Sequence, residues 1–298
     1  MKLILFSKML KEKSVAELAE LAVSLRFDGF DLCVRPGYAV SPENAATALP
    51  EAAALLRRHG LDVPMVTGNF DLLAPDHPTA RPLLAAMDKA GVRLLKLGYF
   101  TFKPPALDYL AEVDRVRRIF DAWQPLARQY GVKICYHTHS DRCMGLNAGS
   151  LMHLLAGFDP ACLGAYLDPG HLVVEGEAFD TALAMVRSHL AIVAVKDVLL
   201  ERVQKNGHGA CKVHWVPAGK GMVDWSAVFA DLRAAGYDGP LSVHCEFEAP
   251  AGGFADAARL EAAFFRAQLP SPSPSPSTPT LTPDLRNPCA NSAVTCYP

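Results

Sequence analysis

Residues 132–139 hold the side chains that could most directly perform chemistry. They read Val-Lys-Ile-Cys-Tyr-His-Thr-His, a short apolar run that ends in His137 and His139. Imidazole binds transition metals and titrates near neutral pH, so two imidazoles at a strand end indicate metal binding or proton transfer. On this segment alone a structural role, with one histidine capping the next loop and the other satisfied in the core, is an equal alternative.

Other apolar runs end in polar side chains in the same way. The strand-end residues that carry polar or ionisable groups are Asp31, Arg35, Thr67, Lys96, Tyr99, His137, His139, Asp168, His171, Lys196, Asp197, His244 and Glu246. Imidazoles and carboxylates brought together from several strands make a ligand set for a transition metal. One such residue alone is unspecific, because a single strand-end Asp more often caps a helix.

Eight strand signals, each followed by a helix signal, must position these residues. The predicted strands cover residues 3–6, 30–34, 63–66, 92–97, 132–136, 163–167, 192–195 and 241–243. The predicted helices cover residues 14–25, 50–59, 82–90, 107–130, 150–156, 181–190, 225–235 and 255–268. This α/β alternation predicts a (β/α)8 TIM barrel. An open doubly wound sheet is disfavoured, because no glycine-rich phosphate loop follows the first strand.

Composition restricts the class of protein and its partners. Of the 298 residues 50% are hydrophobic, and the formal net charge of -2 argues against nucleic acid as a partner. No apolar run approaches the roughly 18 residues of a membrane span, and residues 3–6 are too few for a signal peptide. We therefore expect a cytoplasmic protein with no membrane partner. Residues 1–268 are predicted to form a single barrel domain, and the Pro/Ser-rich residues 269–298 a disordered tail.

Six strand-end motifs point to a known family. They are DLCVRPG at 31–37, YHTH at 136–139, LDPGH at 167–171, VKD at 195–197, PxGxGMVD at 217–224 and HxE at 244–246. Over residues 1–268 the chain resembles the sugar phosphate isomerase/epimerase proteins of the xylose isomerase-like TIM barrel superfamily. The resemblance implies one divalent metal ion, held in relatives by residues of strands five to eight, commonly Glu, Asp, His and Glu.

The relatives' ligand positions fall on a changed set of residues in this chain. They fall at His137, Asp168, Ala194, and His244 or Glu246. The resemblance therefore implies a metal held by His137, Asp168 and His244 or Glu246, with an open position beside Ala194 for water or substrate. These nitrogen-rich ligands favour Mn, Zn, Co or Fe over Mg.

The resemblance also implies roles in proton transfer beside a carbonyl. Glu246 and Asp168 are the candidate catalytic bases, and Lys196 and His171 are placed to stabilise an enediolate oxyanion. His139, His171 and Lys196 are also expected to contact the substrate.

Arg35 is the candidate clamp for a substrate phosphate or carboxylate. It lies in a strand-to-helix loop and precedes Pro36 and Gly37. Its planar guanidinium suits either anion. A structural ion pair with Asp31 is the alternative.

The expected function is a divalent-metal-dependent isomerase or epimerase of a sugar, sugar phosphate or related keto-polyol, acting through an enediolate. One alternative is a dehydratase, a lyase of the inosose or dehydroshikimate type. A sugar-binding barrel without turnover is the other, because Ala194 and the two histidines replace usual ligands. A DNA-repair nuclease is disfavoured by the few ligands and the balanced charge. The expected partner is a small carbohydrate, and a homo-oligomer is left open.

Overall fold

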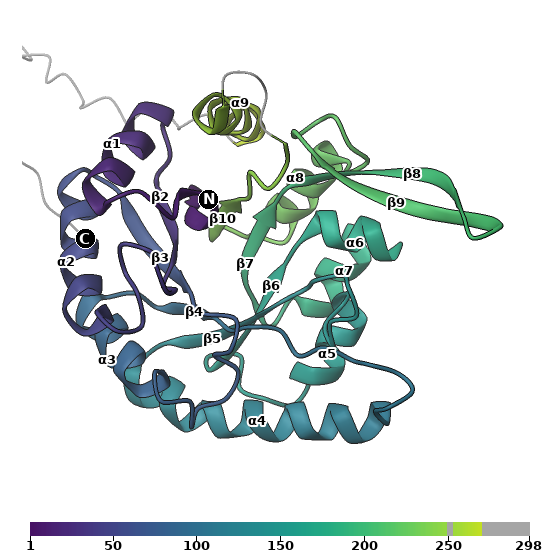
Figure 1. Ribbon diagram of the computed structural model, residues 1–298, viewed down its shortest axis with the longest axis horizontal. Coiled ribbons are helices and arrows are strands. Elements are labelled where there is room, and N and C mark those ends of the chain that lie inside the picture. Colours follow the sequence, from purple (N-terminus) through teal and green to yellow (C-terminus); the bar gives the residue numbers. More distant parts are fainter. Residues whose placement is uncertain (249–252, 270–298) are drawn as a thin grey trace, which may run out of the picture.

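Eight parallel strands close into a barrel in the computed structural model, which describes residues 1–248 and 253–269 (Figure 1). The barrel strands are β1 (Lys2–Phe6), β2 (Gly29–Cys33), β3 (Asp62–Thr67), β4 (Leu94–Lys96), β5 (Lys133–His137), β6 (Leu163–Leu167), β7 (Leu190–Val195) and β10 (Pro240–Val243). They pair in chain order, and β10 pairs with β1, with Leu5 opposite Val243. The predicted TIM barrel is confirmed.

Helices surround the barrel on its outside (Figure 1). They are α1 (Val15–Leu25), α2 (Ala45–Arg58), α3 (Ala80–Ala90), α4 (Tyr109–Tyr130), α5 (Ala148–Leu155), α6 (Pro169–Glu175), α7 (Phe179–Val186), α8 (Trp225–Ala234) and α9 (Gly253–Gln268), with the 3-10 turn η1 (Ser7–Leu10) after β1. The start of α1 has a capping box, in which Ser14 and Glu17 each accept from the other's backbone N–H. None of the described helices has the length and apolar character to cross a membrane.

Helix α2 begins five residues earlier than its prediction. The predicted helix begins at Pro50, a residue that favours the first turn, but Pro50 lies inside the observed helix. Its missing N–H costs a hydrogen bond, which burial of the apolar face through Leu49 and Leu56 offsets.

A hairpin that was not predicted follows β7. Strands β8 (Asp197–Lys205) and β9 (His208–Val216) pair antiparallel and extend away from the barrel (Figure 1). Their side chains are largely exposed, so the apolar alternation of a buried strand is absent. Asn206 and Gly207, both with positive φ, carry the turn signal of such a hairpin.

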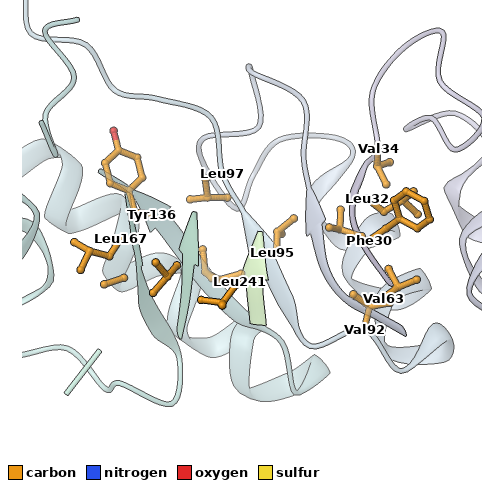
Figure 2. Packing of buried hydrophobic residues seen from close by; sticks show 14 of the residues in the cluster. Phe30, Leu32, Val34, Val63, Val92, Leu95, Leu97, Tyr136, Leu167 and Leu241 are labelled. Carbon is orange, nitrogen blue, oxygen red and sulfur yellow. The ribbon is translucent and has the colours of Figure 1, made fainter. Parts of the chain in front are cut away.

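The core has two layers, because successive strand residues face opposite sides of the sheet. Side chains such as Phe30, Leu95 and Leu241 belong to the large cluster that fills the space between strands and helices (Figure 2). A smaller cluster fills the barrel interior; it consists of Ile4, Met65, Cys135, Tyr166, Ile192 and Ala194. The predicted tail lies outside the described residues except for Leu269.

Asp197 organises the chain that returns from the hairpin. Its buried carboxylate accepts from the backbone N–H of Gly219 (2.8 Å) and Gly221 (3.1 Å) and from Trp225 Nε1 (3.1 Å). It also accepts from the N–H of Val198 and Val223. A Cβ at Gly221 would lie 2.1 Å from Asp197 Oδ1, so only glycine permits this approach.

Glu261 attaches α9 to the same loop. Its Oε1 accepts from Ala218 N at 2.7 Å, while its buried Oε2 has no hydrogen-bond partner among the described residues. Burial, with a contribution from the charge of Asp197, raises the pKa of Glu261 to about 7.

Glu261→Gln is expected to stabilise the protein at pH 8 and not at pH 4.5. The pKa rises from 4.5 to about 7 on folding, so the folded state holds the extra proton and wild-type stability falls as pH rises through that interval. Above pH 7 the buried Glu261 is ionised and the full loss of stability, on the order of 1–3 kcal/mol, is present. Urea unfolding at both pH values measures the gain, with Glu20→Gln on exposed α1 as the control. An equal gain at both pH values would contradict this account.

Candidate active site at the barrel mouth

The carboxyl ends of four neighbouring strands bring the predicted residues into one site. His137 ends β5, Asp168 follows β6, Lys196 follows β7, and His244 and Glu246 follow β10. All except Glu246 are buried. Parallel strands whose ends meet on one face explain why residues so far apart in the chain lie together.

Lys196 lies between the two carboxylates. Its Nζ is 3.5 Å from Asp168 Oδ2 and 3.4 Å from Glu246 Oε2. It is also 2.8 Å from His171 Nε2 and 4.1 Å from the ring centre of Trp215 on the hairpin. The hairpin therefore contributes one wall of the site.

Asp168 joins the site to helix α6. Its Oδ1 accepts from His171 N (3.1 Å) and caps the helix, and Thr138 Oγ1 accepts from Asp168 N (2.9 Å). Its Oδ2 points into the site, 3.3 Å from His137 Nε2. Burial opposes ionisation of Asp168, but the charge of Lys196 and the hydrogen bond from His171 N oppose this effect and lower its pKa.

Glu246 is ionised for similar reasons. It forms an ion pair with Lys8 of η1 as well as with Lys196. Burial opposes its charge, but the nearby His244 and the charges of Lys196 and Lys8 outweigh it and hold its pKa well below the ordinary range.

The orientation of His244 follows from a chain of buried hydrogen bonds. The Tyr166 hydroxyl donates to Asp31 Oδ2 at 3.0 Å and lies 2.9 Å from His244 Nε2. A hydroxyl has one hydrogen, so His244 Nε2 is assigned as the donor in the second contact. Its Nδ1 then faces Glu246 Oε2 at 3.4 Å. A proton or a cation between these two atoms would make their contact favourable.

The other three imidazoles are neutral at pH 7. Burial lowers the pKa of His137 and of His171 well below the usual range and that of His139 to about 4. His137 Nδ1 pairs with the Tyr99 hydroxyl at 2.8 Å, and His139 Nδ1 donates to Ser140 O at 2.9 Å. A neutral imidazole keeps a lone pair, which metal binding and proton abstraction both need.

The predicted metal ligands fit a divalent ion by their chemistry. His137 Nε2, Asp168 Oδ2 and His244 Nδ1 are buried without hydrogen-bond partners among the described residues. Imidazole nitrogen and carboxylate oxygen are ligands for transition metals. As the side chains stand, however, no three His, Cys, Asp or Glu residues in the described part of the chain are arranged to hold a metal ion. Lys196 takes the place beside Asp168 and Glu246.

Arg35 lines the same pocket at the barrel mouth as His137, Lys196 and Glu246. Its Nε donates to Gly68 O at 3.1 Å, and its guanidinium carbon lies 4.1 Å from the centre of the Phe70 ring. The alternative ion pair with Asp31 is not formed. Asp31 instead accepts from Thr67 Oγ1 at 2.6 Å, besides Tyr166 and Ser242.

Two contributors to the site were not predicted. Tyr166 was predicted only as part of the apolar strand 163–167, although a buried phenol usually has a hydrogen-bond partner. Lys8 lies just after β1, where only a phosphate loop was considered. Because Lys8 follows a barrel strand, its position in the sequence was enough to predict that it lies at the barrel mouth.

Comparisons with known proteins agree with this architecture. The family model for the xylose isomerase-like TIM barrel matches residues 19–268. An inosose dehydratase of Lacticaseibacillus casei is 26% identical over 160 residues, which cover 51% of this chain and 53% of that protein. The chain thus spans about half the length of the curated relatives it matches.

Solved structures are similar over nearly the whole chain. The 3-keto-D-glucoside 4-epimerase of E. coli superposes with a TM-score of 0.69 at 18% identity, covering 90% of this chain and 99% of that one. The IolI protein with a bound zinc atom superposes with a TM-score of 0.68 at 17% identity, covering 90% and 98%. At these identities the likeness establishes the fold alone.

Proposed function

This chain belongs to the xylose isomerase-like TIM barrel family, and we propose that it isomerises or epimerises a sugar or a related keto-polyol. The reaction moves a proton on a carbon beside a carbonyl. The observation that carries the proposal is the position of Lys196 between Asp168 and Glu246 in the barrel mouth. A carboxylate and an ammonium at one point can respectively take a proton and stabilise the oxyanion that results.

Glu246 is the proposed proton acceptor. It lines the pocket, whereas Asp168 is fully buried and caps α6 through one oxygen. Lys8 and Lys196 hold Glu246 ionised before substrate binds. When Lys196 turns to the substrate oxygen, Glu246 loses a positive neighbour and becomes a stronger base.

Lys196 is the proposed oxyanion stabiliser, and two histidines support substrate binding. His171 Nδ1 lies 2.8 Å from Ser140 Oγ, to which it can donate, so that His171 Nε2 accepts from the Lys196 ammonium at 2.8 Å. The hydrogen on His139 Nδ1 is used by the Ser140 carbonyl, which leaves His139 Nε2 to accept from a sugar hydroxyl.

The proposed metal ligands are His137, Asp168 and His244, with Glu246 as the fourth. A bound divalent ion would supply the Lewis acidity that polarises the substrate carbonyl. The donor types favour Mn, Zn, Co or Fe over Mg. His137 Nε2, Asp168 Oδ2 and His244 Nδ1, which have no hydrogen-bond partner among the described residues, support this assignment. The zinc atom bound by the IolI protein, which has the same fold, supports it as well.

Metal binding is expected to compete with Lys196 for the two carboxylates. Lys196→Met should therefore tighten binding of Mn2+ or Zn2+ about tenfold, because it frees Asp168 and Glu246 from the ammonium. His137→Ala should weaken binding by at least a similar factor. Calorimetric titration of the metal into each variant measures both changes. Equal affinity in wild type and both variants would contradict the assignment.

Hydrogen exchange with solvent tests the proposed reaction. Wild-type protein with Mn2+, Zn2+ or Co2+ is incubated in deuterated water with a panel of ketoses and aldoses, their phosphates and their acids, and followed by NMR. The expected result is deuterium at one carbon beside the carbonyl, with an isomer or epimer as the product. Absence of exchange on every sugar and with every metal would refute the proposal.

A dehydratase is the second candidate, because the matched curated relatives are inosose dehydratases. The same proton abstraction would then be followed by loss of a β-hydroxyl as water. An ultraviolet-absorbing conjugated ketone would appear with inososes as substrates. Isomer formation without such a band would exclude this candidate for the sugar tested.

A further inference from the structure

Two buried cations in the pocket have no carboxylate partner in the described part of the chain. Arg35 and Lys96 are 5% and 3% exposed. Among the described residues no Asp or Glu forms an ion pair or a hydrogen bond with either. Burying a charge without a counter-ion is costly, so this arrangement indicates a binding role for the pair.

The contacts that Arg35 and Lys96 make among the described residues are to carbonyl oxygens and aromatic rings. Lys96 Nζ donates to Leu97 O at 3.2 Å and lies 4.0 Å from the centre of the Tyr99 ring. Arg35 uses only Nε, toward Gly68 O, and packs on Phe70. The two terminal nitrogens of the guanidinium remain available for the parallel hydrogen bonds that a bound oxyanion accepts.

The two charges act on each other. Burial first, and then the charge of Arg35, lower the pKa of Lys96 to about 7. An anion placed between them would remove this mutual repulsion and favour the charged form of Lys96.

The pocket has the dimensions for a small charged group beside the reaction site. Arg35, Lys96 and Phe70 line an inner cavity of about 60 Å³, where a buried water needs roughly 10–15 Å³. An outer cavity of about 310 Å³ is lined by His171 and Trp215. Both cavities share the side chains of Lys8, His139, Lys196 and Glu246.

We propose that Arg35 and Lys96 form a binding subsite for an oxyanion of the substrate, so that the substrate is an acidic sugar or sugar derivative. The anionic group occupies the inner cavity and the polyol the outer one. The carbon that exchanges its proton then lies between them, beside Lys196 and Glu246. That the bound molecule is a substrate rests on the proposed function, but binding of an oxyanion at Arg35 and Lys96 can be tested without any reaction.

Matched ligands with one ring skeleton test the subsite. D-Glucuronate, D-glucose 6-phosphate and D-glucose are titrated into the full chain at constant ionic strength by calorimetry. Wild type is expected to bind at least one anionic ligand about tenfold tighter than D-glucose, which is the effect of one or two charge-assisted hydrogen bonds. Preference for D-glucuronate would identify a carboxylate subsite, and preference for D-glucose 6-phosphate a phosphate subsite.

Variants separate the subsite from folding defects. Arg35→Met and Lys96→Met should each remove most of the preference for the anionic ligand, whereas Arg35→Lys and Lys96→Arg should keep part of it. Lys89→Met removes the same charge from an exposed position of α3 and should change nothing. A melting curve for each variant shows whether it is folded.

The outcomes distinguish this inference from the proposed function. Equal affinity of wild type for acidic and neutral sugars, or no binding of either, overturns the subsite. Retained preference in folded Arg35→Met and Lys96→Met overturns it as well. Deuterium exchange on neutral ketoses without anion preference would support the proposed function and refute the subsite. Preference for the anionic ligand without deuterium exchange on any sugar would support the subsite and refute the proposed function.

Discussion

Asp168→Asn is expected to reduce kcat/KM for exchange of the carbon-bound hydrogen about a thousandfold or more while the protein stays folded. The substitution removes the charge that faces Lys196 and His137 and one of the proposed metal ligands. Loss of a group that acts in metal binding and in positioning the oxyanion stabiliser has effects of this size.

The fold should tolerate this change. Asparagine caps helices as well as aspartate does, so the hydrogen bond from His171 N to the side chain at position 168 is kept. Asp224 caps α8 in the same way by accepting from Ala227 N at 3.0 Å, but on the surface. Asp224→Asn is therefore the matched control and should retain full activity.

The measurement is the rate of deuterium incorporation into the sugar that wild type exchanges, with a melting curve for each variant. A rate within tenfold of wild type for folded Asp168→Asn would contradict the role of this carboxylate. A similar loss in Asp224→Asn would show that helix capping, rather than the site, accounts for the effect.

Asp197→Ala is expected to lower the free energy of unfolding by about 3–5 kcal/mol, the largest stability effect that we expect. The change leaves four backbone N–H groups and the indole N–H of Trp225 without their acceptor. Each buried donor left unsatisfied costs about 1–3 kcal/mol, and relaxation or entry of water recovers part of the sum.

Urea unfolding measures this loss, and two variants show its cause. Asp197→Asn keeps one acceptor oxygen and should lose less stability than Asp197→Ala. Gly221→Ala should also destabilise, because its Cβ would collide with the Asp197 carboxylate. Wild-type stability in Asp197→Ala would mean that the loop does not depend on this carboxylate.

The barrel itself was predictable because its signals are local. Helical spacing, the capping box at Ser14 and the apolar runs reflect the periods of helix and strand, which neighbouring residues share. Two predictions failed for local reasons as well. The start of α2 was predicted too late because Pro50 lies inside this helix. The hairpin around Asn206 and Gly207 was not predicted because its strands lack a buried apolar face.

The candidate site was predictable only as a list of side chains at one end of the barrel. Topology places strand ends together, so His137, Asp168, Lys196 and His244 were expected to be neighbours, and they are. Their partners were not predictable. The ion pair expected as an alternative for Arg35, with Asp31, is absent, and Lys196 lies where a metal ion was expected to meet the carboxylates.

Periodicity and motif spacing in the chain are enough to predict a TIM barrel with imidazoles and carboxylates at its mouth. Only the tertiary structure decides that Tyr166 joins Asp31 to His244, across 135 and 78 residues, and that Arg35 and Lys96 have no carboxylate partner among residues 1–248 and 253–269. The physical reason is distance. Hydrogen bonds and ion pairs form only when two atoms lie within about 3–4 Å of each other. A sequence pattern specifies the strand end at which a side chain lies, but not the atom that it contacts.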